Sequence, residues 1–223
     1  MERGLINLKN AAALLGMEEG KLRTMAVQGE IDHIMRGDAY FFEQEKLDLW
    51  KTNQIIAKSK NDNSQGADQE PLPIPDGCVC ANLPGTTKAG ILRELTSLAE
   101  NSGFLYDPED FRHELERREE QGTTNMGEGI AIPHPLTRDE GYFSEDFVCI
   151  AKLARPSYFN SAPDGSITEL LILSCSLDSA RHIKMLSRIS RICGVKNFME
   201  NVRNAETDEE LLQVFRDAEK QCK

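Results

Sequence analysis

The stretch from residue 58 to residue 77 limits most strongly how this chain can fold. Its first half is polar, and three prolines follow at positions 71, 73 and 75, with few apolar side chains to bury. Such a composition cannot offset the entropy lost on ordering, so we predict a flexible linker with a stiffer Pro-rich end. The linker separates two modules, residues 1–57 and 78–223, each long enough to form a domain.

The charge balance limits the partners that the chain can bind. Its 223 residues include 26 Lys and Arg against 37 Asp and Glu, a formal net charge of −11. This argues against a broad polyanion-binding surface, because affinity for phosphate backbones needs clustered cations, although a small basic element remains compatible. The six cysteines are dispersed and no leader is evident, which indicates reduced thiols in a cytoplasmic protein. Because no apolar run approaches the ~18 residues that span a bilayer, we expect no membrane insertion.

The first module has the pattern of a small helical domain with a hairpin. Apolar residues recur at helical spacing from Leu8 to Leu15 and stop at Gly16. A second helix is predicted over residues 18–27, and two short strands, 31–35 and 39–42, flank a turn at 36–38. An amphipathic helix over residues 43–57 completes the order that is typical of a winged helix-turn-helix.

Three stretches of this module, residues 5–16, 28–31 and 40–50, resemble the excisionase-type, MerR-like DNA-binding module. The resemblance implies a recognition helix in the major groove, here residues 18–27, and a wing at residues 36–38 against the backbone. The DNA-contacting residues would then be Lys21, Arg23, Thr24, Gln28 and Arg36.

The charges of this module leave its role open. Glu18 and Glu19 begin the recognition helix and Asp38 adjoins Arg36, so acidic groups would face DNA phosphates. One interpretation is DNA binding, as a homodimer, because one module with so few cations would bind weakly. The other is a helix-turn-helix that serves protein contact or dimerisation.

The second module mixes helices and strands. Helices are predicted over residues 88–102, 107–120 and 182–193, and a last helix begins at a Thr207–Glu210 capping box. Apolar strands are predicted over residues 129–133, 147–153 and 169–175. We therefore expect an α/β sandwich, with a mixed sheet flanked by helices.

Residues 118–135 contain the groups with the most chemistry. Glycines at 122, 127 and 129 permit tight turns and close approach to backbone amides, and Thr123 and Thr124 supply hydroxyls. His134 follows a short strand and lies between two prolines, on a stiff backbone. A neutral imidazole can accept a phosphoryl group if hydroxyls, amides and a cation surround the oxygens. On these residues alone, a buried structural histidine is favoured over a nucleophile.

Four motifs in this module resemble the IIA domain of the sugar phosphotransferase system, of the fructose/mannitol type and its nitrogen-regulatory relatives. They are Arg118-Glu119, Gly122-Thr123-Thr124, the Gly-Glu-Gly-Ile-Ala-Ile-Pro-His string of 127–134, and 182–187. The resemblance implies that His134 accepts a phosphoryl group from a phosphohistidine carrier (HPr or its nitrogen-branch relative). His182 would lie beside it, Arg118 would neutralise phosphoryl charge, and no metal or organic cofactor would be required. The expected phosphate-binding residues are Thr123, Thr124, Gly127 and Gly129.

These observations favour a two-domain cytoplasmic regulator that is a phosphohistidine phosphocarrier. Phosphoryl transfer to His134 would be relayed through the N-terminal module to DNA or to a regulated protein. Three alternatives stay open. The chain could be a sugar-transport component that passes phosphate to a separate IIB domain, a binding protein with an unused His134, or a DNA-binding protein whose IIA fold only oligomerises.

Overall fold

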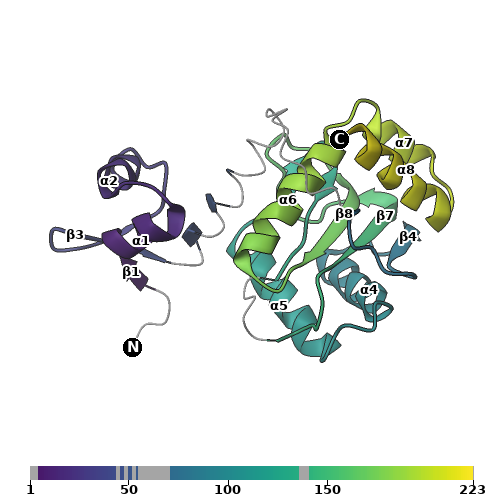
Figure 1. Ribbon diagram of the computed structural model, residues 1–223, viewed down its shortest axis with the longest axis horizontal. Coiled ribbons are helices and arrows are strands. Elements are labelled where there is room, and N and C mark those ends of the chain that lie inside the picture. The colour runs from purple at the N-terminus through teal and green to yellow at the C-terminus, as the bar shows by residue number, and fades with distance from the viewer. Residues whose placement is uncertain are drawn as a thin grey trace. The chain divides into compact units, whose positions relative to one another are not determined.

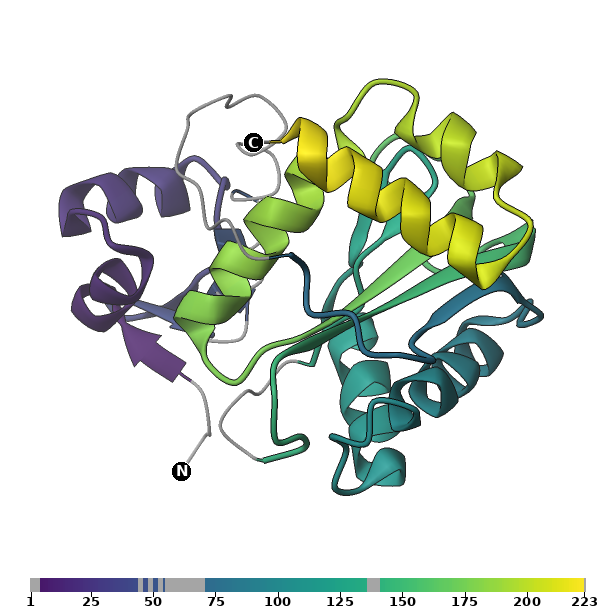
Figure 2. The same cartoon turned by 45° about the vertical axis from the view of Figure 1, so that its right-hand side comes forward.

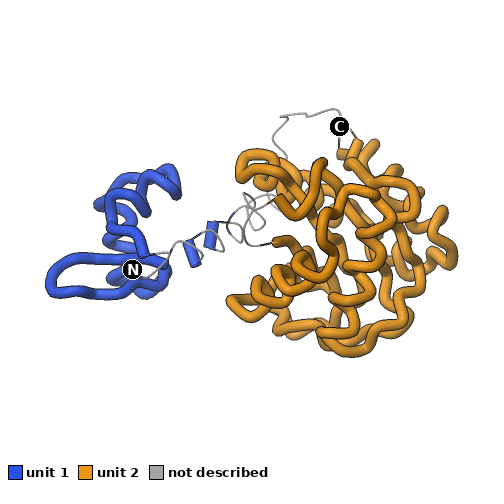
Figure 3. The backbone as a smooth tube through the Cα atoms, turned by 90° about the horizontal axis from the view of Figure 1, so that it is seen from below, with its two compact units in different colours: residues 1–57 blue, residues 58–223 orange. Residues whose placement is uncertain are grey.

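The chain forms two compact units, residues 1–57 and 58–223 (Figure 3). A computed structural model describes residues 5–43, 46–47, 50–51, 54, 71–135 and 141–222. Most of the helix expected over residues 43–57, and residues 58–70 of the expected linker, lie outside the described residues. Each unit is therefore considered by itself.

The smaller unit combines two helices with a three-stranded antiparallel sheet. Its elements are β1 (Leu5–Asn7), α1 (Leu8–Leu15), α2 (Glu19–Val27), β2 (Ile34–Arg36) and β3 (Ala39–Glu43), and the sheet order is β1-β3-β2. The Asn7 side chain caps α1 by accepting the amide of Asn10, and Gly16 closes the helix in the left-handed conformation. The two helices and the hairpin confirm the predicted elements, whereas β1 was not predicted.

The core of this unit is built mainly from α1, α2 and β3. Leu22 and Ala26 of α2 pack with Ala11, Ile31 and Phe42 in one buried cluster. The segment that follows β3 is held to the unit by two hydrogen bonds. Trp50 donates to the Glu30 carbonyl at 3.1 Å, and Lys51 donates to the Leu14 carbonyl at 2.9 Å.

The larger unit is built on a five-stranded mixed sheet. Its strands are β4 (Val79–Leu83), β5 (Asn125–Gly127), β6 (Ile130–Ala131), β7 (Phe147–Ser157) and β8 (Thr168–Cys175), in the order β4-β7-β8-β6-β5. The β4–β7 and β6–β8 pairs are parallel, and the β7–β8 and β5–β6 pairs are antiparallel. The predicted strands are confirmed, and β4 and β5 are two edge strands that were not predicted.

Helices cover both faces of this sheet (Figures 1 and 2). On one face lie α4 (Lys88–Glu100) and α5 (Pro108–Gln121), and on the other lie α6 (Ser179–Cys193), α7 (Phe198–Asn204) and α8 (Asp208–Gln221). The predicted caps are present, because Asp107 accepts two amides at the start of α5 and Thr207 forms a capping box with Glu210. The predicted α/β sandwich is confirmed, and α7 is the helix that was not predicted.

Alternation along β8 explains why both faces are covered. Leu171, Leu173 and Cys175 point into the core shared with α4 and α5. Successive side chains of a strand point to opposite faces, so Ile172 and Ser174 point toward the face that α6 covers. All five residues are fully buried. None of the helices in the described residues combines the length and the apolar character needed to cross a membrane.

The Pro-rich end of the predicted linker belongs to the larger unit. Leu72 is buried, its amide donates to Glu219 at 2.6 Å, and its carbonyl accepts from Arg216 at 3.1 Å. The amide of Val148 donates to the Pro73 carbonyl at 2.8 Å. The expectation of a linker up to residue 77 is therefore corrected. Local composition could not reveal it, because the partners of Leu72 lie more than 140 residues away in the sequence.

We predict that Glu219→Ala releases this anchored segment. Glu219 is 8% exposed and accepts from Leu72, Arg188 and Arg216, so its loss leaves these donors without their acceptor. Such a loss should lower the free energy of unfolding by about 2 kcal/mol. Urea unfolding and amide exchange at Leu72 measure the effect. Asp217→Ala, an exposed carboxylate on the same helix, is the control and should leave both unchanged. Equal behaviour of the two variants would contradict this anchor.

Candidate active site

His134 lies directly beyond β6, on an extension of the same strand. The Ile132 amide donates to the Thr124 carbonyl at 3.0 Å on one side. The Ser174 amide donates to the Pro133 carbonyl at 2.9 Å on the other, which continues the parallel β6–β8 pairing. The backbone that carries the imidazole is therefore held from both neighbouring strands, and His134 itself is 2% exposed.

The hydrogen bonds of the His134 ring define its tautomer. Nδ1 lies 2.8 Å from the carbonyl oxygen of Ile132. A carbonyl can only accept, so Nδ1 carries the proton and Nε2 carries a lone pair. Nε of Arg118 donates to Nε2 at 3.2 Å. The ring is thus a neutral imidazole whose nucleophilic nitrogen is oriented toward a cation.

Arg118 reaches this position from the last turn of α5. Its side chain is buried, and Nη1 donates to the Gly122 carbonyl at 2.8 Å while Nε faces His134. These two bonds use different arms of one planar guanidinium, which fixes its orientation. A full positive charge is therefore held beside the lone pair of Nε2.

His182 approaches His134 from the other side, in the first turn of α6. The two ring centroids are 4.7 Å apart with an angle of 52° between the planes, and both rings are buried. The first turn is the positive end of the helix dipole, which favours an anion nearby. The structure thus brings together His134, His182 and Arg118, which are 16 to 64 residues apart in the sequence.

The four predicted phosphate-binding residues are placed differently. The Thr124 hydroxyl hydrogen-bonds to the carboxylate of Glu119, and the Thr123 hydroxyl accepts from the Asn125 amide at 3.1 Å. The Gly129 amide donates to the Ser166 hydroxyl at 3.0 Å. In this conformation the Thr124 hydroxyl and the Gly129 amide serve the protein's own loops. The role of these four residues in binding a phosphoryl group stays a prediction.

The two glycines at 127 and 129 also have a structural reason. Both have positive φ, +85° and +81°, and a Cβ at Gly127 would lie 3.0 Å from the Asp164 carboxylate. That carboxylate accepts the Glu128 amide at 2.7 Å and the Ser166 amide at 3.0 Å. The Glu128 amide first, and then Ser166, lower the pKa of Asp164 to about 2. Asp164 therefore clamps the β5–β6 turn as an anion at neutral pH.

A polar network holds the end of α5 that carries Arg118. The Glu119 carboxylate accepts from the Asn160 side chain at 2.8 Å, and the Asn125 side chain donates to the Asn160 carbonyl at 2.8 Å. Thr168 donates to Asn125 at 3.0 Å and completes the network. These contacts fix the end of α5, where Arg118 lies. Glu119 was visible as part of the Arg118-Glu119 motif, but no local signal identified Asn125 or Asn160.

The predicted DNA-contacting residues all lie in the smaller unit. Lys21, Arg23, Thr24 and Gln28 are exposed on α2 and at its C-terminal cap, and Arg36 is exposed at the end of β2. Arg23 lies over the Tyr40 ring at 5.3 Å and Arg36 over the Phe41 ring at 5.7 Å. The Thr24 hydroxyl donates to the Gly20 carbonyl at 3.0 Å. The two arginines are thus stacked on aromatic rings of β3.

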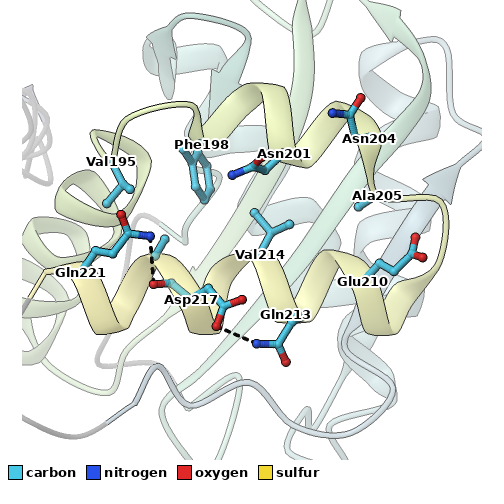
Figure 4. A pocket seen from close by; sticks show the side chains of 11 residues that line it. Val195, Phe198, Asn201, Asn204, Ala205, Glu210, Gln213, Val214, Asp217 and Gln221 are labelled. Atoms are coloured by element: carbon cyan, nitrogen blue, oxygen red, sulfur yellow. Dashed lines mark hydrogen bonds between the residues drawn. The ribbon is translucent and has the colours of Figure 1, made fainter.

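A separate cavity of about 430 Å³ opens between α7 and α8 (Figure 4). Apolar side chains of Phe198 and Val214 and polar side chains of Asn201 and Gln213 line it. Gln213 donates to the Asp217 carboxylate at 2.8 Å across one turn of α8. The residues that line this cavity include none of the predicted site residues.

Fold and site together describe an α/β domain with a paired-histidine centre at the carboxyl end of β6, inside a mixed sheet. Residues 74–218 match the family described as the phosphoenolpyruvate-dependent sugar phosphotransferase system, EIIA 2. The chain belongs to this family, which confirms the resemblance for the larger unit. Residues 1–57 lie outside the matched range.

Relatives with known names agree with this family. The chain is 29% identical to a nitrogen regulatory protein of Pseudomonas aeruginosa over 148 residues, 66% of this chain and 94% of that protein. It is 23% identical to a fructose-like EIIA component of Escherichia coli over 135 residues, 60% of this chain and 89% of that protein. Both regulatory and sugar-specific IIA proteins are thus among its relatives.

Solved structures agree with the fold. The nitrogen regulatory protein IIA-Ntr of Neisseria meningitidis aligns with a TM-score of 0.57 at 23% identity, covering 64% of this chain and 95% of that chain. The mannitol IIA of Escherichia coli aligns with a TM-score of 0.56 at 18% identity, covering 65% of this chain and 99% of that chain.

Proposed function

We propose that this chain is a cytoplasmic IIA-type regulatory protein that accepts a phosphoryl group on His134 from an HPr-like phosphohistidine carrier. The N-terminal unit would relay the phosphorylation state to its target. The observation that carries the proposal is the state of the His134 ring. Its Nδ1 carries the proton, and the lone pair of its Nε2 accepts from Nε of Arg118 at 3.2 Å.

The transfer requires no proton movement at His134. The N–P bond of the carrier's phosphohistidine breaks as a P–Nε2 bond forms, and the carrier's nitrogen leaves with the electron pair of the broken bond. Nδ1 of His134 keeps its proton and continues to donate to the Ile132 carbonyl. The phosphoryl oxygens then carry about two negative charges, and the ring, which is bonded to phosphorus at Nε2 and keeps its Nδ1 proton, carries one positive charge. Arg118 donates to Nε2 in the unphosphorylated protein and would turn to donate to the phosphoryl oxygens after transfer. His182 and the first turn of α6 would face the same negative charge.

The test uses the full chain with phosphoenolpyruvate, enzyme I and a carrier protein. We expect one phosphoryl group per chain, in a bond that is acid-labile and alkali-stable. If no cognate carrier labels the wild-type chain, then phosphoryl acceptance is excluded and the chain acts as a silent binding module.

For the smaller unit we propose a helix-turn-helix role in binding, with α1 and α2 as its helices and the β2–β3 hairpin as its wing. The exposed Lys21 and Arg23 on α2 support DNA binding. Exposed apolar side chains support protein contact, since Val27 is 68% exposed and Met35 is 47% exposed.

Selection of duplexes at low salt separates the two roles, because enrichment of one sequence requires DNA binding. Light scattering of the same sample tests for a homodimer.

A transport role is the second candidate function. The Escherichia coli mannitol IIA, to which this chain is similar at a TM-score of 0.56, is solved in complex with phosphorylated IIB. If this chain is a transport component, then a IIB domain should remove the label from phosphorylated His134. Retention of the label with the IIB domains of the same cell favours regulation.

A further inference from the structure

Ser174 has a buried hydroxyl close to His134 that the proposed function does not yet use. It is the penultimate residue of β8, and its side chain is fully buried. Within the part of the chain that the structure describes, its Oγ has no hydrogen-bond partner. A buried hydroxyl without a partner costs free energy, so its presence here calls for a physical explanation.

The register of the sheet places this hydroxyl beside the imidazole. Ile130 pairs with Leu170 and Ala131 with Leu171 in the parallel β6–β8 ladder. Extension by three residues pairs His134 with Ser174. The hydrogen bond from the Ser174 amide to the Pro133 carbonyl, 2.9 Å, is the one that a parallel pair of this register requires.

The same register places both side chains on one face of the sheet. Ala131 and Leu171 belong to the core with α4 and α5. Because successive side chains of a strand alternate between the two faces, the residues three positions further along, His134 and Ser174, point to the opposite face. His182, on α6, contacts His134 on this face. The hydroxyl of Ser174 therefore lies next to the ring that Arg118 and His182 also approach.

We propose that Ser174 is a phosphoryl-binding residue, whose hydroxyl donates to an oxygen of the phosphoryl group on Nε2 of His134. This inference rests on the proposed function of His134. The hydroxyl keeps its proton throughout, and it turns about χ1 to donate when the phosphoryl group arrives. The partner missing in the unphosphorylated protein is then supplied by the phosphoryl group, and hydrogen bonds to a charged acceptor are stronger than those between neutral groups.

The equilibrium of phosphoryl exchange and the urea midpoint should respond differently to Ser174→Ala. The equilibrium of phosphoryl exchange with the carrier should move toward the carrier about tenfold, because one donor to the phosphoryl oxygens is lost. The urea midpoint of the unphosphorylated protein should stay equal or rise, because the removed hydroxyl has no partner there. A purely structural serine would lower the midpoint and leave the exchange equilibrium unchanged.

Ser190→Ala is the matched control. Ser190 is equally buried and lies eight residues beyond His182 on α6, about 12 Å along the helix. Its replacement should leave the exchange equilibrium unchanged. A Ser174→Ala protein that exchanges phosphate like the wild type overturns this inference and leaves the proposed function intact. A wild-type chain that accepts no phosphate overturns both.

Discussion

His134→Ala is expected to abolish phosphoryl acceptance completely. The reaction needs a nucleophilic nitrogen. The Ile132 carbonyl holds the proton of His134 on Nδ1, which leaves Nε2 unprotonated. Its neighbour His182 does not replace it in this proposal, because Arg118 donates to Nε2 of His134. We therefore expect no label above background after incubation with phosphoenolpyruvate, enzyme I and carrier.

The measurement is acid-labile label per chain, or the mass of the intact protein. His113→Ala is the matched control, because His113 is an exposed histidine on α5 whose side chain is 60% accessible, and it should label like the wild type. Thermal unfolding of both variants verifies that each remains folded. Label that persists in a folded His134→Ala protein would show that another residue is the acceptor.

Arg118→Lys is expected to slow phosphoryl acceptance by about a hundredfold. Lysine keeps the charge but loses the planar fork that bonds to His134 Nε2 and the Gly122 carbonyl at the same time. A single donor removed from a preorganised charge-stabilising site typically costs a factor of 100 to 1000 in rate. The loss should appear in the rate of transfer more than in the affinity for the carrier.

Stopped transfer reactions at several carrier concentrations separate those two quantities. Arg117→Lys is the control, since Arg117 is adjacent in the sequence, pairs with Glu114 at 2.8 Å and is half exposed. It should transfer at the wild-type rate. Equal rates for the Arg118 and Arg117 variants would remove Arg118 from the phosphoryl site, whereas His134 would keep its role.

The sequence predicted the parts of the fold that depend on neighbours within one or two turns. Asp107 caps α5 and Thr207 caps α8, and each cap joins groups two or three residues apart. The apolar stripe of α6 likewise follows from its own periodicity. The resemblance of residues 118–134 and 182–187 to a IIA domain predicts His134, His182 and Arg118 as site residues, and the fold brings these three side chains together.

Other features depend on pairing between distant segments. The strands β1 and β4 are short, and their hydrogen-bonding partners lie far along the chain in β3 and β7. Such strands carry little pattern of their own, because pairing with a neighbour determines whether they form. The same holds for Leu72, whose place in the larger unit depends on Glu219, 147 residues away.

The candidate residues His134, His182 and Arg118 could be predicted from the sequence, together with the helices and central strands that hold them. The three-dimensional fold was needed to show which nitrogen of His134 carries the proton, which loop groups are already hydrogen-bonded, and that the strand register pairs Ser174 with His134. The reason is physical. Periodicity and capping act between residues close in the chain, whereas a tautomer or an unsatisfied hydroxyl depends on atoms that strand register brings within about 3 Å.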